Sequence, residues 1–422
     1  MPPVFTLLAC LLGTSLLVAT PIQLHAAPAG PSTDLAAPTP AVRALANPAG
    51  PGAMGSALTT TPDGTVLLSW LEPIGAEVWA LKFSRFEAAT KNWGVARAIA
   101  TGRDWFINWA DFPSVTPLSD TDLMAVWFEN NPDGAHHDGH HGSGYHARYS
   151  LSHDSGATWS TPHRLTGESA VTEFAAVLAL GEQSRALVAW LDGRARAGHR
   201  PVQALYAQTM AAGGADMLVD SSVCDCCQLA LVRVGDDALL AYRGRTDNEV
   251  RDIWLARWRH GAWEAPRALH DDAWEISACP VNGPRLVARG EHVAAIWFTA
   301  AQGKPRVQAK VSRDGGETFG DVLAIDLGRP QGRVDAVMLD DGTTLFTWLE
   351  LTGNEAGKAG GIFLRRLSAA GEMSDAELLA PSTTARAGGF PRIAQLSPTQ
   401  LLLSYTAQNG VSRVATLLID FN

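Results

Sequence analysis

Three cysteines crowd into four positions of the sequence, in the segment VCDCCQ. They are Cys224, Cys226 and Cys227, and Cys279 lies downstream in CPVNGP. Thiols at this spacing favour a disulfide, redox chemistry or a site for a soft metal such as copper or zinc. Adjacent Cys226 and Cys227 are poorly placed to bridge each other, so a disulfide would join Cys279 to one of the three. We expect the four cysteines to form a functional thiol site, with the disulfide kept as the alternative.

A second group of chemically active side chains is a histidine cluster in the segment ENNPDGAHHDGHHGSGYH. Its members lie within eleven positions: His136, His137, His140, His141 and His146. Imidazoles at this density chelate Cu(II), Ni(II) or Zn(II), but the glycines and aspartates between them specify no rigid geometry. A solvated loop without a role is the alternative interpretation.

The elements that position these groups follow from an internal repeat. A short apolar strand with an aromatic residue recurs seven times, about 50 to 60 residues apart. The copies are LLSWLE, MAVWFE, LVAWLD, LLAYRG, AAIWFT, LFTWLE and LLSYTA. Most have another strand and a turn before them and one or two strands after them, which is typical of a four-stranded propeller blade. The sequence therefore predicts an all-β, seven-bladed propeller, with six blades and an appended sheet as the alternative.

The two ends of the chain predict how the ring closes. The last repeat ends after its third strand, ATLLID, whereas AVRAL at residues 41–45 resembles the outer strands of other blades. We expect AVRAL to complete the last blade, because an unpaired sheet edge would otherwise remain exposed.

Two turns carry a more specific pattern, SHDSGATW and SRDGGETF. In each, an aspartate can accept hydrogen bonds from the turn and a glycine permits a positive φ. Both turns resemble the Asp-box of the sialidase-like (BNR) β-propellers, S-x-D-x-G-x-T-W/F, which is a structural motif. The resemblance implies structural roles for Asp154, Gly156, Trp159, Asp314, Gly316 and Phe319. With VCDCCQ, YRGRTDNEVRDI and CPVNGP, nearly the whole mature chain is similar to exported bacterial propellers labelled sialidase-like.

The sialidase resemblance also implies candidates for glycoside hydrolysis. Sialidases use three arginines on the substrate carboxylate, a Tyr-Glu nucleophile pair and an Asp acid/base. The candidates are Asp111 as acid, Glu173 or Glu249 as carboxylate, Tyr242 as nucleophile, and Arg243, Arg251 and Arg333 as positive groups, with Arg285 and Arg392 in addition. The Arg-Ile-Pro of the family's first inner strand is absent, because this chain has MGSALTT there. We therefore expect no competent sialidase and keep exo-sialidase hydrolysis as the alternative function.

Propeller topology predicts that these groups share one face. Loops that enter the inner strands, and loops that join second to third strands, emerge together around the central channel, at a face that we call the mouth. The cysteine segment, the histidine loop and most of the arginines and carboxylates belong to the mouth, whereas the Asp-box turns belong to the opposite face. The predicted ligand at the mouth is a small molecule, a glycan or a metal ion. A scaffold that binds a protein partner is the second alternative.

The N-terminus predicts export. Residues 1–27 resemble a signal peptide, residues 28–40 form a flexible Ala/Pro-rich leader, and residues 41–422 form the propeller. The periplasm or the medium is the expected location, where disulfides persist. A net charge of −10 disfavours nucleic acid and anionic membranes as partners. No segment after the signal is apolar for long enough to span a bilayer, and we expect a monomer.

Overall fold

The computed structural model describes Met1 and residues 40–130, 144–167, 171–181, 185–194, 202–210, 214–353 and 359–421. The strands lie in the compact unit Pro38–Asn422. In the described ranges the one helical element is the short 3₁₀ turn η2 (Ala301–Gly303), and no helix there could cross a bilayer. The predicted signal peptide and nearly all of the leader lie outside the described residues, as do His136, His137, His140 and His141.

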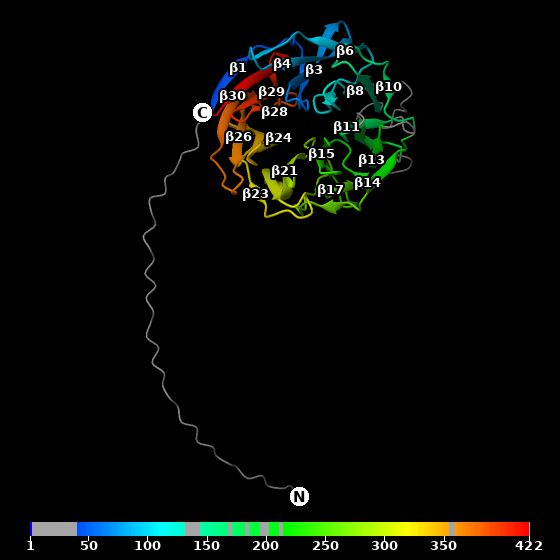
Figure 1. Ribbon diagram of the computed structural model, residues 1–422. Helices are drawn as coiled ribbons and strands as arrows, with labels where there is room; N and C mark the ends of the chain where they lie inside the picture. Colours follow the sequence, from blue (N-terminus) through cyan, green and yellow to red (C-terminus); the bar gives the residue numbers. More distant parts are fainter. Residues whose placement is uncertain are drawn as a thin grey trace, which may run out of the picture. The chain divides into compact units, whose positions relative to one another are not determined.

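The described strands form seven antiparallel sheets, which follow one another around a ring (Figure 1). Blade 1 contains β2 (Met54–Thr60), β3 (Val66–Gly75), β4 (Val78–Glu87), β5 (Asn92–Trp93) and β6 (Arg97–Gly102). Blade 2 contains β7 (Ser114–Pro117), β8 (Leu123–Asn130), β9 (Tyr145–Ser152) and β10 (His163–Arg164), and blade 3 contains β11 (Thr172–Ala179), β12 (Ala186–Asp192), β13 (Gln203–Thr209) and β14 (Met217–Val223). Blade 4 contains β15 (Ala230–Val234), β16 (Asp237–Arg243), β17 (Ile253–Arg259), β18 (Ala262–Trp263) and β19 (Arg267–Ala268). Blade 5 contains β20 (Arg285–Arg289), β21 (His292–Thr299), β22 (Arg306–Ser312) and β23 (Leu323–Ala324). Blade 6 contains β24 (Pro330–Met338), β25 (Thr344–Leu351), β26 (Ala359–Leu367) and β27 (Glu377–Thr383). Blade 7 contains β28 (Gly389–Ser397), β29 (Gln400–Asn409), β30 (Val411–Asp420) and β1 (Ala41–Leu45). The predicted all-β propeller of seven blades is confirmed, and the six-bladed alternative is wrong.

The ring closes between the two ends of the propeller. Strand β1 pairs antiparallel with β30, from Ala41 opposite Asp420 to Leu45 opposite Thr416. The side chain of Leu45 is buried, whereas Val42 in the same strand is exposed. The N-terminal strand therefore completes the last blade, as predicted.

The aromatic residue of each repeat lies in the core between blades. Trp70, Trp127, Trp190, Trp297 and Trp348 are all fully buried. In four blades the indole N–H donates to the carboxylate two residues later: Trp70 to Glu72 (2.8 Å), Trp127 to Glu129 (3.3 Å), Trp190 to Asp192 (2.8 Å) and Trp348 to Glu350 (2.5 Å). Residues two apart in a strand point to the same face, so each carboxylate satisfies an indole that would otherwise be buried without a partner. The Trp-x-acid repeat is thus explained by packing and hydrogen bonding.

The strand register separates the two faces, as blade 5 shows. Cys279 precedes β20, whose first residue, Arg285, pairs with Ile296 near the end of β21. The second Asp-box follows β22 at Ser312, which pairs with Val293 near the start of β21. The cysteine and the Asp-box therefore lie at opposite ends of the same sheet, as the topology predicts.

The Asp-box turns fasten neighbouring blades together. The carboxylate of Asp154 accepts from the Thr158 backbone N–H (2.8 Å), and Asp314 does the same with Thr318 (3.0 Å). Gly156 has φ of +81°, and a Cβ there would lie 2.3 Å from the ring of Phe83 in blade 1. The remaining motif residues pack similarly, Trp159 edge-on to Phe83, Gly316 against Leu239, and Phe319 against the core between blades 4 and 5.

Candidate functional site

Four of the inner strands begin with the same backbone irregularity. The register shifts at the starts of β2, β11, β24 and β28, and one residue in each shift is left-handed: Gly55, Phe174, Arg333 and Phe390, with φ between +50° and +65°. A bulge of this kind changes the direction in which a side chain points. For residues other than glycine the conformation costs about 1 to 3 kcal/mol, and such strain is concentrated at functional sites.

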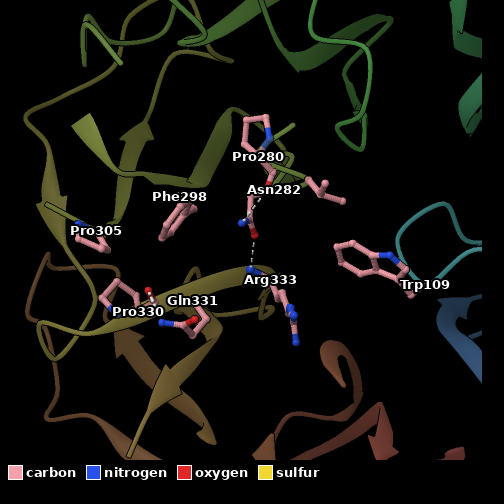
Figure 2. Close-up of a pocket in the computed structure, with 9 residues that line it drawn as sticks. Trp109, Pro280, Asn282, Phe298, Pro305, Pro330, Gln331 and Arg333 are labelled. Atoms are coloured by element: carbon pink, nitrogen blue, oxygen red, sulfur yellow. Dashed lines mark hydrogen bonds between the residues drawn. The ribbon is translucent and has the colours of Figure 1, made fainter. Parts of the chain in front are cut away.

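One of these bulges lines a pocket at the mouth. The pocket has a volume of about 300 Å³ and is lined by Trp109, Pro280, Val281, Asn282, Phe298, Pro305, Pro330, Gln331 and Arg333. Figure 2 shows Trp109 reaching in from a loop on the side opposite Pro305 and Pro330. The pocket therefore combines residues from the loop before β7, the segment before β20, and strands β21 and β24 with their connections.

Arg333 is the charged group of this pocket, and its backbone is fixed. Its backbone N–H donates to Asn282 Oδ1 at 2.8 Å, and its Nη1 donates to the Gly388 carbonyl. The guanidinium lies over the ring of Phe390, 4.9 Å from the centroid, and 6.0 Å from that of Trp109. No carboxylate within the described ranges forms an ion pair with Arg333. Burial lowers the pKa of Arg333 to about 10, so the side chain is still cationic at neutral pH.

Two further predicted arginines lie on neighbouring inner strands. Arg285 of β20 forms an ion pair with Asp335 at 2.5 Å. Arg392 of β28 lies over the ring of Phe112 at 5.2 Å. Burial, and then the nearby charge of Arg285, lower the pKa of Arg392 to about 10, against the opposing effect of Asp335. Blades 5, 6 and 7 thus each contribute one arginine from the mouth end of their inner strand.

The predicted acid, Asp111, is buried in the loop before β7, which also contains Trp109. Its Oδ2 accepts from the Tyr145 hydroxyl at 2.6 Å and from the Phe174 backbone N–H at 2.9 Å. Burial raises the pKa of Asp111 to about 7, against the effect of both hydrogen bonds. Glu173, the other predicted carboxylate, is also buried and accepts from Gln203 Nε2 at 2.8 Å. Neither carboxylate lines the pocket.

Tyr242 and Arg243 have positions that differ from those of a nucleophile and a substrate-binding arginine. Tyr242 is fully buried between blades, and its hydroxyl donates to Asp220 at 2.6 Å. Arg243 is buried and donates to the carbonyls of Asn282, Arg251 and Phe298 at 2.6 to 2.8 Å. Asn282 in turn accepts from the backbone N–H of Arg333. Arg243 therefore supports the pocket through Asn282 but does not line it.

The thiol cluster lies next to the pocket at the mouth. Cys224 Sγ is 3.7 Å from Cys226 Sγ and 3.3 Å from Cys227 Sγ, and the three sulfurs all lie within 4.8 Å of one another. Cys279 from the next blade lies within 4.8 Å of Cys226, as the predicted convergence requires. All four thiols are free, so a disulfide is not confirmed.

Charged groups surround the thiols. Arg251 Nη1 lies 3.4 Å from Cys224 Sγ and 3.2 Å from Asp225, while its Nη2 pairs with Glu249 at 2.7 Å. Burial raises the pKa of Cys224 to about 12. Burial opposes ionisation of Cys227 as well, but its sulfur neighbours, the charge of Arg243 and the backbone N–H of Asn282 together hold its pKa well below the usual value.

The histidine cluster contributes one described residue, His146 of β9. Its side chain is buried, and Nε2 lies 3.8 Å from Glu129. Burial, followed by the charges of Arg164 and Arg148, lowers the pKa of His146 to about 4. His146 is therefore neutral at pH 7, and it belongs to neither described group of metal-type ligands.

Several pocket residues were not singled out from the sequence. Trp109 and Asn282 lie in NWADFP and CPVNGP, two segments that the topology places at the mouth. In these segments only Asp111 and Cys279 were predicted to belong to the site. For Trp109 the sequence does contain a signal, which is a tryptophan in a polar loop. Tryptophan is enriched at binding sites, where it provides a rigid aromatic surface.

The fold and mouth define a seven-bladed propeller with a cationic, aromatic pocket. No family model and no curated protein matches the chain. Among solved structures, it is similar to a protein of unknown function from Dyadobacter fermentans DSM 18053, with 15% identity, TM-score 0.52, and coverage of 90% of this chain and 99% of that one. It is also similar to a PL25 ulvan lyase bound to -[GlcA(1-4)Rha3S]-, with 10% identity, TM-score 0.53 and coverage of 89% and 95%. A Hadza microbial sialidase, Hz136, matches with 16% identity, TM-score 0.43 and coverage of 70% and 63%. For the two structures with TM-scores above 0.5, the property shared at these identities is the fold alone.

Proposed function

We propose that this propeller binds an acidic saccharide at its mouth, with the carboxylate on Arg333. The observation that carries the proposal is a half-buried guanidinium without an acidic partner in the described part of the chain. A desolvated cation is costly unless an anion neutralises it, and the planar guanidinium fits a carboxylate with two parallel hydrogen bonds. The ligand is therefore expected to supply the missing negative charge.

The remaining lining favours a sugar. Trp109 and Phe298 offer flat apolar surfaces, and Asn282 and Gln331 offer amides for hydroxyl groups. A volume of about 300 Å³ is at the small end of ligand pockets, which fits one or two sugar rings better than a long chain. The ulvan lyase with the same fold is described as bound to a glucuronate-containing saccharide, which makes uronates the first class to test.

Hydrolysis of the bound saccharide is the second candidate function, and Asp111 favours it. A carboxyl group with a pKa near 7 can act as a general acid at neutral pH. However, Asp111 is buried outside the pocket lining and would reach a saccharide only after a rearrangement. All five tyrosines lie in the described ranges and none lines the pocket, so a sialidase-type nucleophile is also missing from it. We therefore propose binding without sialidase turnover.

Export is part of the proposal. Residues 1–27 have the pattern of a signal peptide, and an acidic saccharide is a ligand that a periplasmic or secreted protein would meet. N-terminal sequencing of the protein from the periplasm or the medium tests this part. A mature chain that begins near residue 28 supports export, and an intact Met1 in the cytoplasm contradicts it.

The binding proposal is tested by calorimetric titration with a glucuronate-containing disaccharide. Arg333→Ala is expected to weaken binding by at least about 10-fold, since hydrogen bonds to charged groups contribute about 1.5 to 3 kcal/mol. Arg289→Ala removes an exposed arginine at the opposite end of blade 5 and is the matched control, with unchanged affinity expected. Equal affinities of all three proteins would contradict the proposal.

A further inference from the structure

We propose that Cys224, Cys226 and Cys227 bind one Cu(I) ion at the mouth, beside the saccharide pocket. This site is independent of the proposed saccharide binding, because none of the three cysteines lines the pocket. The proposal commits to Cu(I) rather than to soft metals in general. It rests on the spacing of the sulfurs, their burial and the groups around them.

The sulfur positions fit a single ion. Sulfurs held about 2.3 Å from one metal lie about 3.8 to 4.0 Å apart in tetrahedral or trigonal geometry. The observed separations are 3.7 Å between Cys224 and Cys226 and 3.3 Å between Cys224 and Cys227. The Cys224–Cys227 separation is therefore about half an ångström shorter than this range, and all three sulfurs lie within 4.8 Å of one another. A small side-chain rotation that moves one sulfur outward brings this pair to the required separation.

The donor set favours Cu(I) over Zn(II). Soft thiolates select Cu(I) and Zn(II), but structural Zn(II) almost always takes four ligands. In the described part of the chain the buried group holds three sulfurs, without a histidine or a carboxylate as fourth member. Cys279 belongs to a separate group with Asp225 and Cys226. A three-coordinate site of sulfur alone suits a monovalent soft ion.

Burial and charge support the same site. Cys224 and Cys227 are almost fully buried, whereas Cys226 is half-buried and Cys279 is exposed. Three thiolates and one Cu(I) carry a net charge of −2, and a buried charge requires compensation. Arg251 lies 3.4 Å from Cys224, and its other nitrogen is fixed by Glu249. Arg251, the last arginine in YRGRTDNEVRD, thus has a role in positioning and neutralising the cluster.

The exposed side of the cluster offers a route for the ion. Asp225, Cys226 and Cys279 lie within 4.8 Å of one another at the surface of the mouth. Cys226 is common to both groups, so an ion received by Cys279 and Cys226 can pass to the buried sulfurs by exchange of one ligand at a time. The arrangement suits a protein that acquires and releases copper.

Cu(I) titration of the reduced, untagged chain without oxygen, in competition with bicinchoninate, is the test. We expect about one Cu(I) per chain, with the thiols of residues 224, 226 and 227 protected from alkylation when copper is bound. Cys226→Ser should weaken binding by more than about 100-fold, because even changes outside the ligand shell cost 10- to 100-fold. Arg251→Gln changes a residue outside the ligand shell and should weaken Cu(I) binding by about 10-fold.

Three outcomes would overturn the proposal. The first is failure of copper to protect the thiols of a folded wild-type chain, a measurement that does not depend on any variant. The second is preferential uptake of Zn(II), with all four thiols protected. The third is loss of the bound Cu(I) when His136, His137, His140 and His141 are all replaced by glutamine, which would place the ion in the histidine loop.

Discussion

Asp111 makes the stability of the propeller depend on pH in a direction opposite to that of most carboxylates. Its side chain is buried, and burial raises its pKa from 3.8 to about 7. Between these two values the native state keeps the proton and the unfolded chain does not, so the free energy of unfolding falls as the pH rises. At 1.36 kcal/mol per pKa unit, the stability lost by pH 8 is about 4 kcal/mol.

The substitution Asp111→Asn removes this dependence. The amide oxygen can still accept from the Tyr145 hydroxyl and the Phe174 N–H, so the hydrogen bonds and the packing are retained. The variant should match the wild type near pH 4 and gain about 4 kcal/mol relative to it by pH 8. Urea unfolding followed by tryptophan fluorescence at several pH values measures the difference. Asp236→Asn, at a fully exposed carboxylate, is the control with a flat difference. A flat difference for Asp111→Asn as well would refute the reasoning.

Other predictions test the closure, the Asp-box and the absence of sialidase chemistry. Leu45→Ala should lower the free energy of unfolding by about 2 to 3 kcal/mol, and Val42→Ala by under about 0.5, in urea titrations; equal effects would contradict closure by β1. Gly156→Ala should lower the Tm more than Gly261→Ala, because both have φ of +81° but only the first Cβ would meet a neighbour, at 2.3 Å; equal losses would show that the turn is not packed. A fluorogenic sialoside should not be hydrolysed above a denatured control, and saturable hydrolysis abolished by Asp111→Ala would reverse this conclusion.

The fold was predictable because its signal is repeated. Each blade contains the same apolar strand, and Trp70 and Trp348 show the same indole–carboxylate bond 278 residues apart in the chain. Repetition let weak local patterns reinforce one another, and AVRAL could then be assigned to the last blade as its missing strand. The topology in turn predicts that Cys279 neighbours Cys227 across adjacent blades, and in the structure Cys279 lies beside Cys226 of the same cluster.

The pocket was less predictable because it depends on the backbone of the inner strands. Nothing in the sequence GRVD indicates that Arg333 takes a left-handed conformation, or that Asn282 from another blade fixes it there. Tyr242 shows the reverse difficulty, since its residue type suggested chemistry while its place in the strand buried it against Asp220. Composition therefore identified the charges at the mouth, and long-range packing decided which of them reach a ligand.

The central claim is that Arg333 recognises the negative charge of a saccharide. The most direct test compares a glucuronate-containing disaccharide with its methyl ester, which has nearly the same shape but no charge, on the wild-type protein. We predict that the ester binds at least about 10-fold more weakly, and that added salt weakens the acid but not the ester. Equal affinity of the acid and the ester would contradict the account.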